Sequence, residues 1–258
     1  MAVWLLVCAP AYAWQKADSS KVKVNLSLNG NISEGNANRW ILINRASLNW
    51  KPGNGKIEIE HSDYYLYGKV QGNRFENNIL DRTIISLHSS PKIKPFAALF
   101  LESYPVRNQD FRWQAGAGLK YTLYQKKGWF IEPALMLSYS KQQFFTANFK
   151  DFDNGGSNEL ETSYLTPVVN IQMPLFAGKL ILSHHFWAQL DLSGDGNNRL
   201  YYDGKVLMKL NKAFGLQLII NNYWEQLVQA ARGTGSQGPS ITHNDLIVAY
   251  GVTFNMAK

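Results

Sequence analysis

The sequence has little cysteine and no long apolar run. Of its 258 residues only Cys8 is a cysteine, and it lies in an apolar N-terminal segment, so the rest of the chain cannot form a disulfide framework. The mean hydropathy is −0.25. A helix that crosses a membrane needs about 20 consecutive apolar residues, and the sequence contains no such stretch. These absences exclude a disulfide-rich scaffold and a helical membrane protein.

Clustered charge is also missing. The formal net charge is +7, but lysine and arginine are dispersed, with no basic run and no basic helix. We therefore expect no nucleic-acid binding. The excess of positive charge favours contact with anions, such as solutes or the phosphates of lipopolysaccharide. No linker rich in proline or serine divides the chain, so a single domain is the simplest interpretation.

The first 13 residues resemble the end of a secretory signal peptide. They are apolar and carry small residues at Ala11 and Ala13, which is the pattern of a cleavage site after Ala13. The positively charged start of such peptides is missing, which indicates a signal peptide truncated at its start. We expect residues 1–13 to be removed, Cys8 with them, and residues 14–258 to form the folded domain.

About twelve stretches of the sequence alternate apolar and polar residues. The clearest is 111–124, where Trp113 and Leu119 share one face with other apolar side chains, and Arg112 and Lys120 lie on the opposite face. Such alternation places one face of a strand against an apolar phase and the other against polar groups. We predict strands at 22–32, 39–50, 56–67, 76–89, 95–104, 111–124, 129–144, 160–173, 179–192, 199–211, 214–225 and 244–256.

The connections between these strands alternate in length. Those after even-numbered strands are tight, whereas those after odd-numbered strands are generally longer, notably 146–159 and 226–243. An even number of antiparallel strands with asymmetric loops is typical of outer-membrane barrels, and a soluble β-sandwich, the competing fold, gives no reason for it. We predict a single antiparallel transmembrane β-barrel of about 12 strands. It would lie in the outer membrane of a Gram-negative bacterium, with both termini in the periplasm.

The tryptophans favour the barrel. Trp40 and Trp50 lie on one face of the second strand, ten positions apart. At about 3.3 Å per residue and a tilt near 40°, they are separated by roughly 25 Å along the barrel axis, the height of an outer-membrane apolar band. In a soluble sandwich the same side chains would belong to the core. The residues assigned to aromatic belts at the membrane surfaces are Trp40, Trp50, Trp113 and Trp224.

The last strand resembles the C-terminal signal that outer-membrane barrels present to their assembly machinery. Gly251, Phe254 and Met256 match its glycine, aromatic and large apolar positions. The departures are Ala249, where a polar residue is usual, and the two residues that follow Met256. Together with the barrel fold, the match predicts partners of two kinds. They are the barrel-assembly machinery during biogenesis, and outer-membrane lipids and lipopolysaccharide in the folded state.

Two short motifs resemble those of a known protein family. Residues 33–38 read Ser-Glu-Gly-Asn-Ala-Asn, similar to a Ser-x-Gly-Asn-x-Asn turn. Arg112, Gly116, Gly118 and Tyr121 match an Arg-x-x-x-Gly-x-Gly-x-x-Tyr strand. Both motifs are typical of bacterial outer-membrane proteins described as salt-induced and known as domain of unknown function 481. The resemblance covers most of residues 20–258 and implies an outer-membrane barrel, but it implies no reaction and no catalytic residues.

The strand faces opposite the apolar ones would line the barrel interior. Both signs of charge are then present inside, and about 12 strands lie between the filled and the channel-forming barrel sizes. We therefore expect either a narrow pore with a mild preference for anions or a lumen closed by ion pairs. The residues predicted to line the lumen include Arg39, Arg45, Arg82, Arg112, Lys120, Asp203, Lys205 and Lys209.

The alternative function is a lipid-active hydrolase that acts on phospholipid or lipid A, because some outer-membrane barrels are enzymes. Ser183, His185 and Asp191 share one face of a strand, and His243 lies in the last loop. Cα atoms two positions apart on a strand are about 6.5–7 Å apart, which strains a direct Ser-His hydrogen bond. The sequence predicts no cofactor. It predicts no metal site either, since His184 and His185 point to opposite faces, the other histidines lie in separate segments, and the acidic loop 151–159 lacks the spacing of an EF-hand calcium loop.

Overall fold

The computed structural model describes residues 21–33, 39–53, 55–70, 73–147, 155–194, 196–226 and 244–257. The predicted signal segment 1–13 lies outside the described residues. Within them, none of the helical segments has the length and apolar character of a membrane-spanning helix.

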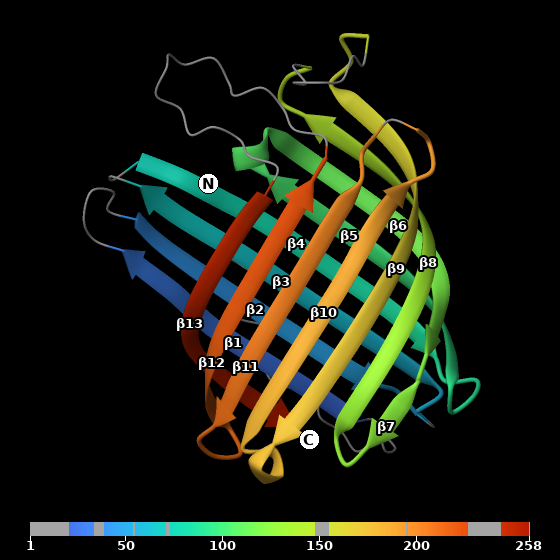
Figure 1. Cartoon of the computed structure of the whole chain (residues 1–258), viewed down its shortest axis with the longest axis vertical. Coiled ribbons are helices and arrows are strands. Elements are labelled where there is room, and N and C mark those ends of the chain that lie inside the picture. The colour runs from blue at the N-terminus through green and yellow to red at the C-terminus, as the bar shows by residue number, and fades with distance from the viewer. Residues whose placement is uncertain are drawn as a thin grey trace.

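Twelve long strands form the wall of a closed antiparallel barrel, and a thirteenth, short strand pairs with only one of them (Figure 1). Each long strand pairs with the long strands before and after it in the chain, and the sheet closes where the first strand pairs with the last. The predicted fold and strand number are confirmed. The strands are β1 (Lys21–Ser33), β2 (Arg39–Lys51), β3 (Ile57–Val70), β4 (Asn73–Leu87), β5 (Ile93–Tyr104), β6 (Gln109–Tyr121), the short β7 (Tyr124–Lys126), β8 (Trp129–Phe144), β9 (Glu159–Leu175), β10 (Leu180–Asp191), β11 (Arg199–Lys209), β12 (Phe214–Glu225) and β13 (Asn244–Ala257), with 3-10 turns η1 (Pro105–Arg107) and η2 (Phe176–Gly178).

The first strand begins and the last strand ends at the same end of the barrel. Lys23 pairs with Ala257, so β1 begins where β13 ends. Outer-membrane barrels have short turns on the periplasmic side, and we assign this end to the periplasm. The short connections found at the same end are 52–56, 88–92, 127–128, 176–179 and 210–213.

The predicted strand 111–124 is divided in the structure. β6 ends at Tyr121, and the ladder resumes in β7 after a break of two residues. At that point β5 has reached its first residue, Ile93, which pairs with Tyr121. The backbone N–H of Thr122 donates instead to the carbonyl of Lys92 at 2.7 Å. β7 then pairs only with β8, so it forms one arm of a periplasmic hairpin.

The connection between β3 and β4 is shorter than the apolar pattern predicts. The pattern places it at 68–75, but the ladder continues to Val70 and restarts at Asn73, with a register shift after Gly68. Backbone N–H and C=O groups pair regardless of the side chains they carry, so the strands extend beyond the segments in which apolar and polar residues alternate. One connection at the outer end is therefore also short.

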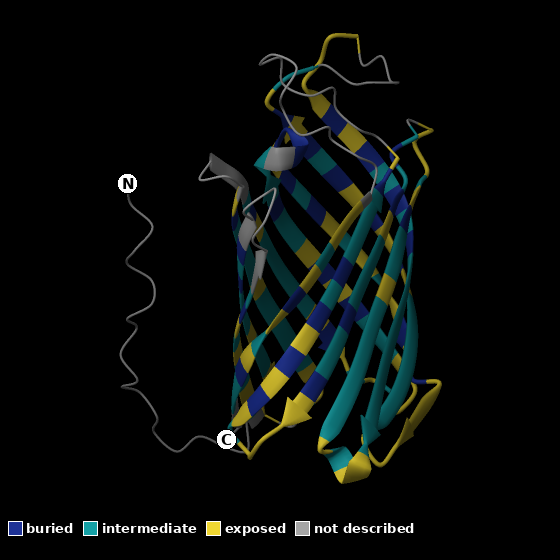
Figure 2. Cartoon of the chain, turned by 60° about the vertical axis from the view of Figure 1, so that its left-hand side comes forward, coloured by how far each residue is buried: buried dark blue, intermediate teal, exposed yellow. Residues whose placement is uncertain are grey.

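The outer surface of the barrel is mostly apolar, and the inner surface carries buried polar groups together with two apolar clusters, around Ile43 and Phe96. Leu137 points outward and is 61% exposed, whereas Arg112 and Gln114 are fully buried inside. Figure 2 shows how buried and exposed residues alternate along the strands. A closed barrel pairs its backbone groups within its own wall, and its apolar exterior is suited to lipid. The chain is therefore an integral β-barrel of the outer membrane.

The tryptophans lie toward the ends of the strands. Trp50 is at the periplasmic end of β2, and Trp224 is near the outer end of β12. Trp113 of β6 packs against Tyr139 of β8, with 5.6 Å between the ring centroids. The side chain of Trp40 lies outside the described residues. The aromatic belts stay a prediction.

Glycines let two pairs of strands approach closely. A Cβ added at Gly251 of β13 would lie 2.0 Å from the carbonyl oxygen of Leu28 in β1. One added at Gly118 of β6 would lie 2.1 Å from the carbonyl oxygen of Leu135 in β8. Only glycine fits at these positions without movement of a backbone. Gly251, predicted as part of the assembly signal, therefore also has a packing role where the barrel closes.

Candidate functional site

The candidate functional site is the barrel interior, where side chains from facing walls meet. Hydrogen bonds and ion pairs there join strands that are not neighbours in the sheet. The lumen is therefore crossed by side chains at several levels between its outer and periplasmic ends.

The level nearest the outer end is a network of buried guanidinium and carboxylate groups. Glu225, the last residue of β12, pairs with Arg107 at 3.2 Å and with Arg199 at 2.7 Å. Arg112 of β6 pairs with Glu102 of β5 at 2.8 Å. None of these five side chains is more than 7% exposed, and a buried charge is tolerated when it is paired. The network ties β12 to the connection between β5 and β6 across the mouth.

Arg107 reaches across the outer mouth from the connection between β5 and β6. It ends η1, and Asn108 after it has a positive φ of 60° that turns the chain into β6. The guanidinium also pairs with Asp245 of β13 at 2.6 Å and lies 4.4 Å from the ring centroid of Tyr223. Burial alone would lower the pKa of Arg107, but Glu225 and Asp245 raise it above its ordinary value. Arg107 is therefore a fixed positive charge at the mouth.

Amide side chains bridge the walls at the next level toward the periplasm. Gln189 of β10 donates a hydrogen bond to Gln114 of β6 at 2.6 Å, and Gln114 donates to Ser138 of β8 at 2.7 Å. Gln142 of β8, at the outer level, accepts a hydrogen bond from Arg199 of β11. β10 and β11 are not neighbours of β6 or β8 in the sheet. These contacts narrow the lumen without adding charge.

An ion pair crosses the middle of the lumen. Arg45 of β2 donates from Nη1 to Asp203 Oδ2 of β11, and from Nη2 to Asn221 Oδ1 of β12, both at 2.9 Å. The guanidinium lies 5.2 Å from the ring centroid of Tyr64. Both charged side chains are 22% exposed. The pair therefore remains in contact with the solvent of the lumen.

Two further cations lie inside the barrel near this level. Arg82 of β4 donates from Nε to Ser62 Oγ at 3.3 Å. Lys205 of β11 lies two positions from Asp203 on the same face and within electrostatic range of Arg45. In the described part of the chain, no ion pair joins Arg82 or Lys205 to an acidic side chain. The middle of the lumen therefore carries an excess of positive charge.

The periplasmic half of the lumen holds balanced ion pairs. Lys120 of β6 pairs with Glu60 of β3 at 2.8 Å, and Lys94 of β5 pairs with Glu132 of β8. Neither contact joins neighbouring strands. These pairs brace the wall and add no net charge.

The structure places most of the predicted lumen residues inside the barrel. Lys209 is exposed at the periplasmic end of β11, and the side chain of Arg39 lies outside the described residues. The alternation of apolar and polar residues did not identify Glu102, Arg107 and Arg199 as lumen residues. Arg199 shares its strand face with other predicted lumen residues, a signal that could have identified it, whereas Arg107 lies in a connection where no periodicity applies. The predicted residues that point inside are Arg45, Arg82, Arg112, Lys120, Asp203 and Lys205.

The predicted catalytic residues are not assembled into one site. His185 faces the lumen, and its Nδ1 is hydrogen-bonded to Asn170 Oδ1 of β9. Asp191 accepts backbone N–H groups of the connection between β10 and β11 at 2.7–3.2 Å, and about 20 Å of strand separates it from His185. Among the described residues, no hydrogen bond joins Ser183, His185 and Asp191. His243 lies outside them.

Comparison with known proteins supports the fold. No protein-family model matches the chain, and no curated protein matches it. The NanC porin structure is similar with a TM-score of 0.52 and 10% identity, over 90% of this chain and 98% of that one. The translocator domain of the autotransporter NalP from Neisseria meningitidis has a TM-score of 0.46 and 13% identity, over 93% and 89%. An anion-selective porin from Comamonas acidovorans has a TM-score of 0.41 and 10% identity, over 92% and 99%. At these identities the similarity to the NanC porin establishes a shared fold, that of outer-membrane barrels.

Proposed function

We propose that the chain forms a narrow passage for small solutes through the outer membrane, with a mild preference for anions. The observation that carries this proposal is the charge of the middle lumen, where Arg82 and Lys205 accompany the pair of Arg45 and Asp203. The polar side chains of the interior suit a hydrated solute. An excess of positive charge lowers the energy of an anion inside and raises that of a cation.

The contacts across the lumen support a narrow passage. Arg45 and Asp203 lie on β2 and β11, which are separated in the sheet by β1, β13 and β12. Arg107 spans part of the outer mouth through its ion pairs with Glu225 and Asp245. Barrels of about 16 strands leave a wide aqueous channel and those of about eight are filled by side chains. A barrel of intermediate size with side chains across it should pass only small ions and solutes.

Conductance through a planar bilayer tests the proposal. The refolded barrel should produce stepwise currents, and its reversal potential under a salt gradient should lie on the anion side of zero. Substituting Arg82→Gln and Lys205→Gln together should move that potential toward zero. Lys141→Gln is a matched control, because Lys141 lies on the outer surface and pairs with Glu159 at 2.7 Å. A folded barrel that yields no current steps contradicts the proposal.

A lipid-active hydrolase is the weaker alternative. The candidate base His185 faces the lumen and is hydrogen-bonded to Asn170, whereas the acyl chains of membrane lipids contact the outer wall. An enzyme that used His185 would have to draw a lipid into the interior. Release of acyl chains from phospholipid or lipid A that depends on His185 would favour this alternative.

We also propose that the chain belongs to the salt-induced outer-membrane family known as domain of unknown function 481. Its proposed partners are the barrel-assembly machinery and lipopolysaccharide. Two features of the family motif have structural roles, since Arg112 pairs with Glu102 and Gly118 allows the close approach of β8. In the last strand, Phe254 packs against Phe214, with 5.1 Å between the ring centroids. The side chain of Met256 lies outside the described residues. Recognition of this strand by the assembly machinery and contact with lipopolysaccharide are tested by crosslinking during biogenesis.

A further inference from the structure

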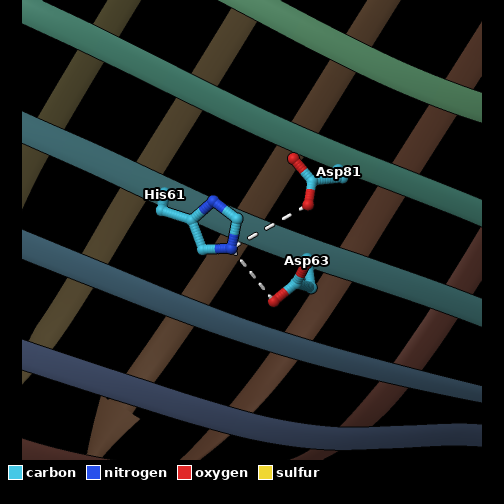
Figure 3. A group of neighbouring side chains, drawn as sticks. All are labelled: His61, Asp63 and Asp81. Atoms are coloured by element: carbon cyan, nitrogen blue, oxygen red, sulfur yellow. Dashed lines mark ion pairs between the residues drawn. The ribbon is translucent and has the colours of Figure 1, made fainter. Parts of the chain in front are cut away.

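The outer wall of the barrel carries ionisable side chains in the middle of its apolar surface. His61 and Asp63 lie on β3, Asp81 lies on β4, and the three point toward one another (Figure 3). Ile57 and Ile79, which share the outward faces of these strands, are 41% and 49% exposed. Lipid offers neither hydrogen bonds nor counter-charges, so carboxylates on this surface require a partner.

The two carboxylates have no permanent cation beside them. Asp63 and Asp81 are direct partners in the ladder of β3 and β4, where like charges repel each other. His61 Nε2 lies 3.4 Å from Asp63 Oδ2 and 3.9 Å from Asp81 Oδ2. Within the described ranges, no lysine or arginine forms an ion pair with either aspartate. The cluster therefore combines two carboxyl groups with one imidazole.

Thr83 orients the imidazole of His61 from outside the cluster. Thr83 Oγ1 lies 2.9 Å from His61 Nδ1, and it can accept a hydrogen bond from an Nδ1–H group. That tautomer leaves the lone pair of the ring on Nε2, the atom that faces both carboxylates. A hydrogen bond to the second ring nitrogen is the usual support of a metal-binding histidine.

We propose that His61, Asp63 and Asp81 bind one divalent metal ion, Zn²⁺ or Mn²⁺, on the outer wall of the barrel. One ligand atom from each residue lies within 4.8 Å of the others. Bonds of about 2.1 Å in a tetrahedral zinc site place ligand atoms roughly 3.4 Å apart, which matches the distance between His61 Nε2 and Asp63 Oδ2. Imidazole with carboxylates suits these two ions.

Charge balance favours a divalent ion over other partners. A neutral imidazole, two carboxylates and one divalent cation sum to zero, the net charge best tolerated at an apolar surface. A hollow of about 570 Å³ on the outer wall reaches Asp63 and is also lined by Asn44 and Tyr65. This hollow leaves room for a water molecule beside Asp63.

Metal binding to the refolded barrel in detergent tests the proposal. After treatment with a chelator, the protein is dialysed to equilibrium against Zn²⁺ alone or Mn²⁺ alone, and the bound metal is counted. We expect one equivalent whose affinity falls at least tenfold in His61→Gln and in Asp81→Asn. Thr83→Val keeps all three ligands and should weaken binding about tenfold, the smaller end of the loss typical of such supporting contacts.

A matched control separates this site from other histidines. His184→Gln changes an outward histidine whose Nδ1 lies 2.9 Å from Tyr202 Oη. This variant should still bind one equivalent of metal. Thermal unfolding gives a second measurement, since Zn²⁺ should raise the midpoint of the wild type but not that of Asp81→Asn. Heat-dependent gel mobility first shows whether each variant is folded. If a ligand variant does not fold, its metal binding is not compared, and Thr83→Val is compared with the wild type instead. Absence of saturable binding, or equal binding by the wild type and the ligand variants, overturns the proposal.

Discussion

Arg45 Nη1 and Asp203 Oδ2 lie 2.9 Å apart across the lumen, although 158 residues separate them in the chain. Their strands, β2 and β11, are brought to facing walls only because β1 and β13 close the sheet. Both side chains remain partly exposed to the lumen. The pair therefore contributes to the stability of the wall and to the charge that a solute meets.

Asp203→Asn should lower stability and strengthen the preference for anions. The substitution leaves Arg45 without its carboxylate and adds positive charge to the middle of the lumen. We expect a loss of roughly 1–3 kcal/mol in the free energy of unfolding, less than for a fully buried pair, because solvent in the lumen screens the charges. Denaturant titration of the refolded barrel measures the stability, and the reversal potential under a salt gradient measures the preference.

The double variant Arg45→Gln with Asp203→Asn is the control for this experiment. It removes both charges, so it should recover part of the lost stability and return the reversal potential toward the wild-type value. The double-mutant cycle isolates the coupling between the two side chains. A coupling energy of zero would mean that the pair is not formed in the membrane.

Arg107→Gln should enlarge the outer mouth. Glutamine has no charge with which to hold both Glu225 and Asp245, so η1 loses its tie to β12 and β13. Glu225 keeps its ion pair with Arg199, and the wall should therefore stay folded. We expect a larger single-channel conductance and a weaker preference for anions, because one positive charge has been lost. Unchanged or reduced conductance would show that Arg107 does not obstruct the passage.

Most of the wall could be predicted from the sequence because the two faces of each strand meet different phases. Trp113 and Arg112 are adjacent in the chain yet lie on opposite sides of the barrel wall, and this parity is visible as alternation. The break at Thr122 and the extension of β3 beyond Gly68 could not be predicted in the same way. Backbone pairing with a neighbouring strand decides where a ladder ends, and alternation of side chains carries no information about it.

The interior contacts could be predicted only as a set of inward residues. Parity places Arg45 and Asp203 inside, but the tilt and closure of the barrel decide which inward residues meet. Arg107 acts from a connection, where no pattern reports its direction. Asp63 and Asp81 interrupt the apolar faces of two strands, and their proximity follows only from the register of β3 with β4.

Gly251→Val should impair closure of the barrel when the protein refolds without the assembly machinery. A Cβ at this position would lie 2.0 Å from the carbonyl oxygen of Leu28 and 2.6 Å from the Cα of Asn29, so the backbone of β1 would have to move. Overpacking of this kind costs typically about 1–3 kcal/mol. Refolding into detergent should yield less of the heat-modifiable form. Val252→Ala, on the outward face of the same strand, should refold normally. Normal refolding of Gly251→Val would show that Gly251 is not needed for packing and leave it only a role in recognition by the assembly machinery.

His185→Ala should leave membrane lipids unaffected and change conduction instead. His185 pairs in register with Asp203 of β11 inside the barrel, and its ring lies 6.4 Å from that of Tyr201. Phe186, the next residue, points outward and is exposed where lipid lies. Acyl-chain release from phospholipid vesicles should therefore be the same for the wild type, for His185→Ala and for vesicles without protein. The conductance of His185→Ala should differ, because the substitution removes a ring from the lumen. Acyl release by the wild type that His185→Ala abolishes, and that the outward variant His184→Ala retains, would instead identify an enzyme whose substrate enters the barrel.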